Sequence, residues 1–129
     1  IAGYDGAYIQ APSLKVNPSF FHAVNLEEPI PVNRRFDLVQ CLEVAEHIHS
    51  TTASSLVHSL CQLSDLILFS AAIPGQGGTN HINEQYPDYW IKFFANEGYL
   101  PFDCLREKIW NNHTIDTCYR QNILFFVQW

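Results

Sequence analysis

The sequence predicts an α/β domain in which a parallel sheet lies under helices. Two nearly continuous apolar runs, at 36–42 and 65–72, are typical of strands that a parallel sheet buries on both faces. Between them, apolar residues recur at helical spacing over 52–63. Strands that alternate with helices indicate an α/β sheet.

Composition restricts the class of protein further. A chain of 129 residues fits a single domain, 1–129, and an apolar content of 47% is ordinary for a globular protein. The net charge of −6 and the lack of a basic run argue against nucleic acid as a partner. No apolar stretch approaches the roughly 20 residues of a membrane span, and the first residues do not resemble a signal peptide. We therefore expect a soluble cytoplasmic protein with no membrane partner.

Local signals place the remaining elements. Ser, Thr and Pro residues mark helix starts, and Gly98 marks a helix end. In chain order we expect strands at 1–6, 20–26 and 36–42, a helix at 52–63, a strand at 65–72, a helix from Pro87 to before Gly98, and a final strand pair at 99–106 and 122–127. The polar and aromatic segment 109–120 is expected to bridge that pair. The four cysteines show no CxxC spacing and are expected to be reduced thiols.

Ionisable groups crowd the end of the strand at 36–42, and this edge is where open α/β sheets bind ligands. Glu43, Glu46 and His47 are spaced so that a helical turn would place them on one face. Two carboxylates about 4 Å apart would repel by roughly 4 kcal/mol at an effective dielectric near 20. Mg²⁺ would relieve that repulsion, with His47 as an auxiliary ligand. The alternative is that Glu43 contacts a cofactor or caps a helix, Glu46 is solvated and His47 packs under a loop.

A second candidate group follows the glycine-rich loop at 75–78. His81 and Glu84 are the candidate catalytic residues, because a neutral imidazole can take a proton near pH 7. Anchoring of the loop by hydrogen bonds is an alternative role for them. A further alternative is a zinc site formed by His47, His49 and His81.

The segment FDLVQCLEVAEHI, at 36–48, resembles the fourth-strand signature of class I S-adenosylmethionine-dependent methyltransferases that act on small molecules. The segments DLILFSAAIPG, HINEQYPDYW and NILFFV follow in the order of that family. The resemblance implies a Rossmann-like sheet, mostly parallel with an antiparallel C-terminal strand pair. It also implies an N-terminally truncated domain, because the family's first strand and glycine-rich G-x-G-x-G loop have no counterpart here.

The resemblance further implies a set of cofactor contacts. Asp5 matches the acidic residue that holds the ribose hydroxyls, and Asn25 matches the position facing the adenine amino group. Gln40, Leu42 and Glu43 match the strand end that lies along the methionine part of S-adenosylmethionine. The pattern Glu-x-x-Glu-His also resembles the metal site of ubiquinone-pathway O-methyltransferases and small-RNA 2′-O-methyltransferases.

The function implied is methyl transfer to an oxygen or nitrogen of a small-molecule acceptor. A hypothesis from another class is a catalytically dead remnant of the fold that serves as a binding or homodimerisation module. The missing strand would leave an unpaired sheet edge, and such an edge invites association with another chain.

Overall fold

The structure is a computed structural model that describes residues 1–129, the side chain of Ala11 excepted. It contains a four-stranded sheet of order β3-β4-β6-β5 and a separate two-stranded sheet, β1-β2. The strands are β1 Gly3–Asp5, β2 Phe21–Ala23, β3 Val39–Leu42, β4 Leu66–Ser70, β5 Tyr99–Phe102 and β6 Leu124–Gln128. The helices are α1 Ala53–Leu63, α2 Pro87–Asn96, α3 Arg106–Ile109 and α4 Thr117–Asn122, with 3₁₀ turns η1 Ala11–Ser13, η2 Pro18–Phe20, η3 Ala45–His47 and η4 Ser50–Thr52.

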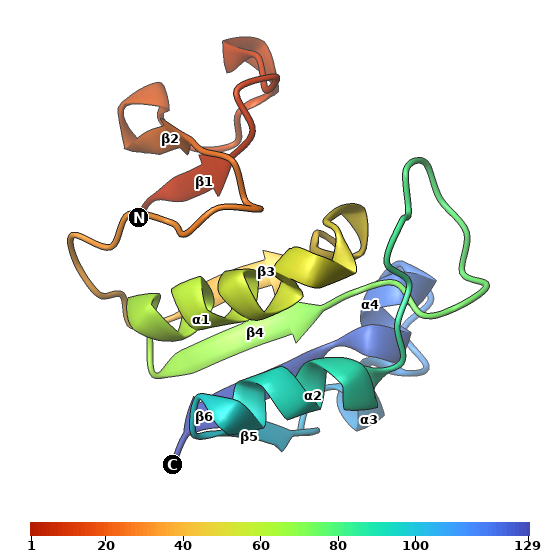
Figure 1. Cartoon of the computed structure of the whole chain (residues 1–129). Coiled ribbons are helices and arrows are strands. Elements are labelled where there is room, and N and C mark those ends of the chain that lie inside the picture. Colours follow the sequence, from red (N-terminus) through yellow and green to blue (C-terminus); the bar gives the residue numbers. More distant parts are fainter.

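The strand directions confirm the predicted fold class. β3 and β4 pair in parallel, whereas β6 runs antiparallel to both of its neighbours, β4 and β5. The two-stranded sheet is parallel as well. In Figure 1 the arrowheads of β1, β3 and β4 all point to the same side of the molecule. The carboxyl ends of these three strands therefore face one edge.

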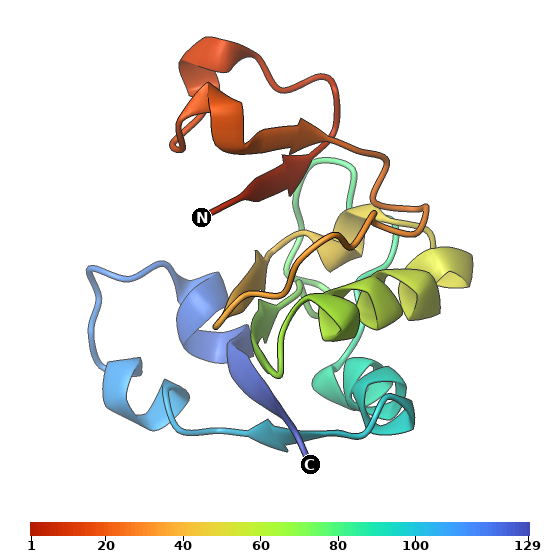
Figure 2. The same ribbon diagram turned by 90° about the vertical axis from the view of Figure 1, so that its left-hand side faces the viewer.

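The core lies on one face of the four-stranded sheet, where α1 and α2 both pack (Figures 1 and 2). Ile67, Phe69 and Phe126 point into this core and are almost completely buried. Their neighbours Leu68 and Phe125, on the opposite face, are only half-buried. The expectation that the apolar strands are buried on both faces is therefore wrong. An apolar run alone does not reveal that both long helices cover the same face.

β3 lies at the margin of its sheet. Among the described strands only β4 pairs with it. The strand is also shorter than expected, since it begins at Val39 and not at Phe36. The backbone N–H of Phe36 donates to the carbonyl of Leu63, at 2.8 Å, and so ties this segment to the end of α1.

The two long helices agree with the sequence prediction, and two short helices were missed. α1 and α2 begin within a residue of the expected positions, and α2 ends before Gly98, whose φ of 82° closes the helix. The predicted strand at 99–106 stops at Phe102, and α3 and α4 form from the segment beyond it. The Arg120 side chain, by donating to backbone carbonyls before α4, fixes this region through contacts that show no period in the sequence. None of the helices in the described chain is both long and apolar enough to cross a bilayer.

All four cysteines are free thiols, as expected. Cys41 and Cys61 are buried, and burial raises the pKa of each thiol to about 12. A thiol with such a pKa stays protonated near neutral pH and is a poor nucleophile. These two side chains therefore act as small apolar residues of the core.

The aromatic cluster under α2 offers a direct test of this core. Phe94 is fully buried and stacks on Phe126 with ring centroids 3.8 Å apart. We expect Phe94→Ala to lower the free energy of unfolding by about 3–5 kcal/mol, because it removes the ring and leaves a cavity. The matched control, Phe102→Ala, removes a ring that is 48% exposed and should change that free energy by only about 0.5 kcal/mol. Urea denaturation followed by circular dichroism measures both, and equal losses would contradict the described core.

Candidate functional site

Main-chain hydrogen bonds hold the turn after β3 against the loop after β4. The N–H of Glu43 donates to both the carbonyl and the hydroxyl oxygen of Ser70, at 3.0 and 3.1 Å. The carbonyl of Glu46 accepts the N–H groups of Ile82 and Asn83, at 2.9 and 3.0 Å. These bonds bring residues 27 to 37 positions apart to one place, at the sheet edge where the projecting loop lies in Figure 1.

Glu43 turns away from the residues that follow it. Its φ is 52°, in the left-handed region, and the 3₁₀ turn begins only at Ala45. The expectation of one helical face shared by Glu43, Glu46 and His47 is therefore not met. The Glu43 carboxylate instead accepts hydrogen bonds from the amides of Gln76, at 2.8 Å, and Asn122, at 3.4 Å. Sequence reasoning missed both amides, since no spacing links them to Glu43.

Glu46 is completely buried, whereas the sequence alternative placed it in solvent. Both carboxylate oxygens lack a hydrogen-bond partner among the described residues. The nearest group that can carry the opposite charge is the His81 imidazole, whose Nε2 lies 3.9 Å from Oε1. Burial raises the pKa of Glu46, because a charged carboxylate loses its hydration there. The two hydrogen bonds that the Glu46 carbonyl accepts hold this residue in its buried position.

The candidate catalytic residues His81 and Glu84 are in direct contact. Oε1 of Glu84 accepts the Nδ1–H of His81, at 3.0 Å. The same carboxylate accepts the backbone N–H groups of Gly75, at 2.9 Å, and Gly77, at 3.0 Å. The hydrogen bond from His81 and the two from the glycines lower the pKa of Glu84. Glu84 thus anchors the glycine-rich loop through its carboxylate.

His47 completes a cluster with Glu46 and His81. The two imidazole rings meet edge to face, with centroids 4.8 Å apart. One ligand atom from each of the three residues lies within 4.8 Å of the others. His49, which the zinc hypothesis included, instead contacts Glu27 through Nδ1, at 2.5 Å. The structure therefore groups Glu46, His47 and His81 and leaves Glu43 and His49 with other partners.

A cavity of about 860 Å³ lies beside this cluster, at the ends of β1, β2 and β3. Asp5, Asn25 and Glu43, three of the five residues expected at a cofactor, line it together with His47. Gln40 lines a different cavity, and Leu42 lines neither of the two. Small-molecule sites commonly have volumes of about 300–1,000 Å³.

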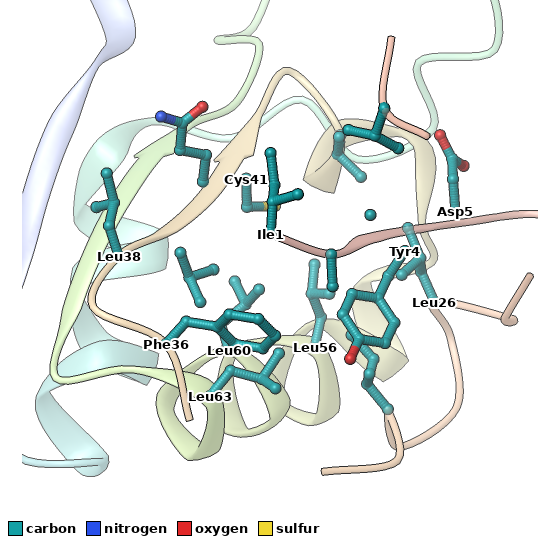
Figure 3. A pocket seen from close by; sticks show the side chains of 17 residues that line it. Ile1, Tyr4, Asp5, Leu26, Phe36, Leu38, Cys41, Leu56, Leu60 and Leu63 are labelled. Atoms are coloured by element: carbon teal, nitrogen blue, oxygen red, sulfur yellow. The ribbon is translucent and has the colours of Figure 1, made fainter. Parts of the chain in front are cut away.

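The cavity lined by Gln40 has a volume of about 450 Å³ and separates β1 from the outer edge of β3. Figure 3 shows that apolar side chains from β1, from β3 and the segment before it, and from α1 surround it, among them Tyr4, Phe36, Cys41 and Leu60. No described strand pairs with β1 or β3 on this side. The apolar run at 36–42 indicates this apolar surface in the sequence, but we expected the run to be buried on both faces of a sheet.

Comparisons with known proteins give matches in structure only. No protein-family model and no curated protein matches the sequence. Magnesium protoporphyrin IX methyltransferase from Synechocystis PCC 6803, solved with bound SAH, superposes with a TM-score of 0.60 at 18% identity. That match covers 84% of this chain and 51% of the methyltransferase. LepI, solved in complex with SAM, superposes with a TM-score of 0.55 at 12% identity, over 89% of this chain and 32% of LepI.

These matches agree in the kind of fold and differ in coverage. The chain spans about half the length of the first protein and about a third of the second. An enzyme described as catalysing a pericyclic reaction also matches, with a TM-score of 0.54 at 13% identity, so the fold is not restricted to one reaction. The chain has the fold of class I S-adenosylmethionine-dependent methyltransferases.

Proposed function

We propose that this chain contributes to S-adenosylmethionine-dependent methyl transfer to an oxygen or nitrogen of a small molecule. The observation that carries the proposal is the cavity of about 860 Å³, around which Asp5, Asn25 and Glu43 lie. These residues come from three separate strand ends. Resemblance in sequence alone assigns all three to a cofactor.

Asp5 has free capacity to hold a ribose. Its Oδ1 accepts the N–H of Gly6, at 2.7 Å, and the hydroxyl of Tyr8, at 3.0 Å. The two oxygens of a carboxylate offer about four acceptor sites. Oδ2 is therefore available for the two hydroxyl groups of a ribose, while Oδ1 fixes the orientation of the side chain.

Asn25 and Glu43 support the same interpretation from the other sides of the cavity. The Asn25 side chain accepts the N–H of Glu27, at 3.1 Å, and donates to Glu28, at 3.2 Å. Its carbonyl oxygen keeps a second lone pair for an adenine amino group. Glu43 offers a carboxylate toward the cationic end of a bound cofactor.

Bound S-adenosylmethionine would supply the activated methyl group. The residues of this chain would align the acceptor and exclude water, which are the main requirements of direct displacement. In this proposal the segment 75–90 covers the acceptor, and His81 takes the proton that the acceptor releases. Glu84 orients the imidazole through its hydrogen bond to Nδ1. The absence of nucleic-acid partners belongs to the same proposal, on the net charge of −6. A cytoplasmic location is part of it as well.

The proposal is tested by calorimetric titration of the chain with S-adenosylmethionine and S-adenosylhomocysteine. Asp5→Asn should weaken binding by roughly tenfold or more, because a hydrogen bond to a charged group contributes about 1.5–3 kcal/mol. The amide oxygen of Asn can still accept from Gly6, so the turn is retained. Asp37→Asn changes an exposed carboxylate that lines neither cavity, and it should leave binding unchanged. A folded chain that releases no heat with either compound would contradict the proposal.

A binding or homodimerisation module is a second candidate function, and the margin position of β3 favours it. The outer edge of β3 is unpaired among the described strands, and the neighbouring cavity is lined largely by apolar side chains. Leu38 is a large apolar residue at this cavity and is 38% exposed. An unpaired edge beside apolar surface favours pairing with another polypeptide.

Sedimentation velocity over a range of protein concentrations tests this second function. If the edge pairs two copies, the sedimentation coefficient should rise with concentration, and Leu38→Lys should shift the equilibrium back to monomer. Leu100→Lys is the matched control, since Leu100 is similarly exposed, at 41%, but lies on β5 at the other side of the sheet. A monomer at every concentration would contradict the dimerisation module.

A further inference from the structure

We propose that one internal water molecule binds between Trp90 of α2 and Asn122 at the end of α4. By accepting from Trp90 and donating to Asn122, this water holds the Asn122 amide in place. The amide contacts Gln76 and Glu43, and Glu43 lines the cavity of about 860 Å³, so Trp90 acts as a positioning residue for that cavity. The water site itself does not depend on methyl transfer. Its effect on a bound cofactor rests on the proposed function.

Two buried polar atoms are complementary and lack a partner among the described residues. Trp90 is 2% exposed, and its Nε1 donates to no described residue. Asn122 is 4% exposed, and its Oδ1 accepts from none of them. A buried donor or acceptor that stays unpaired is costly, because it has lost its hydrogen bonds to bulk water. One atom is a donor and the other an acceptor, so a single molecule between them satisfies both.

Packing fixes the indole of Trp90, so its N–H cannot turn to another partner. The ring centroid lies 5.3 Å from that of Phe69 on β4. It lies 4.9 Å from that of Tyr89, which it meets edge to face. The direction of the N–H follows the ring, because the nitrogen is part of it. The donor must therefore find its acceptor within the core.

Trp90 and Asn122 line the same small cavity. Its volume is about 10 Å³, close to the least that holds one water molecule. Apart from Gln85, the remaining described residues that line it are apolar. A site of this size, with a donor, an acceptor and no charged residue among those that line it, fits water and excludes an ion or a larger ligand.

The number of available hydrogen bonds fits water as well. A buried water typically makes about three, within a range of two to four. The Trp90 indole can only donate, so the water accepts there and keeps both of its hydrogens to donate. One of them goes to Oδ1 of Asn122. The Gln85 amide uses Nε2 to donate to Asn83, at 3.0 Å, and its Oε1 can accept the second.

At its other end, the Asn122 amide continues a chain of hydrogen bonds to Glu43. Nδ2 of Asn122 donates to Oε1 of Gln76, at 2.8 Å, and to Oε1 of Glu43, at 3.4 Å. Nε2 of Gln76 donates to Oε2 of Glu43, at 2.8 Å. From the indole to the carboxylate every group donates in the same direction, and hydrogen bonds in such a chain strengthen one another. The water supplies the link between Trp90 and Asn122.

Water-selective NMR of the 129-residue chain tests the site directly. We expect a rotating-frame Overhauser peak between water and the indole N–H of Trp90, with the sign of cross-relaxation and not of chemical exchange. Trp110 and Trp129 are internal controls, because they are 55% and 94% exposed and their indole N–H groups should show exchange with bulk water. Trp90→Phe identifies the peak by removing it.

A crystal structure of the same chain gives a second, independent measurement. We expect electron density for one water within about 3.2 Å of both Nε1 of Trp90 and Oδ1 of Asn122. A well-ordered cavity without that density would overturn the inference. A direct hydrogen bond between the two side chains would overturn it as well.

A matched pair of variants tests the positioning role. In Trp90→Phe we expect the side-chain amide resonances of Asn122 and Gln76 to shift and their hydrogens to exchange faster with solvent, because the water has lost its donor. Trp110→Phe is the control, since it makes the same substitution at a residue that lines neither the small cavity nor the cavity of about 860 Å³. Circular dichroism verifies that both variants are folded. Equal amide shifts in the two variants would contradict the positioning role.

Calorimetry with S-adenosylmethionine separates this inference from the proposed function. Trp90→Phe should weaken binding severalfold, because Glu43 loses part of its support, and Trp110→Phe should leave it unchanged. A Trp90→Phe chain that binds as tightly as the wild-type chain would overturn the positioning role. A wild-type chain that binds no cofactor but shows the Trp90 water peak would contradict the proposed function and support the water site.

Discussion

The parallel pairing of β3 with β4 is the constraint on which the arrangement of the polar groups depends. Because Val39 pairs with Ile67 and Leu42 with Ser70, the two strands end side by side and point the same way. The turn after one strand and the loop after the other must then leave from the same sheet edge. A shift of the register by one residue would turn Cys41 out of the core and separate the Glu43 N–H from Ser70.

The backbone continues this arrangement beyond the strands. The Glu46 carbonyl accepts two N–H groups from the loop, and Glu84 accepts two more from Gly75 and Gly77. The side chains of the cluster therefore stand on segments that hydrogen bonds fix at both ends. Such support reduces the entropy that a ligand must remove when it binds.

Patterns with a local cause could be predicted from the sequence. The helical spacing of Leu56 and Leu60, and the stop at Gly98, depend on neighbouring residues and gave α1 and α2 nearly correctly. The resemblance to the methyltransferase family assigned Asp5 and Asn25 to the cofactor, and both line one cavity. The pairing of His81 with Glu84 lies within a single turn of chain, which a short spacing can indicate.

What could not be predicted depends on long-range packing. Whether β3 is interior or marginal depends on which strand lies on its other side, and the composition of 36–42 is apolar in either case. The approach of His81 to Glu46 depends on the path of the loop between them. The positive φ of Glu43 could not be predicted either, because glycine commonly adopts positive φ and glutamate does not.

The contact of Glu43 with Gln76 has a consequence for the C-terminal part of the chain. The amide of Gln76 donates to the Glu43 carboxylate at one end and accepts from Asn122 at the other, both at 2.8 Å. A carboxylate can only accept, so its charge dictates which way round the amide sits and hence which end Asn122 meets. The terminus of α4 is therefore connected, through two side-chain amides, to a residue 79 positions earlier.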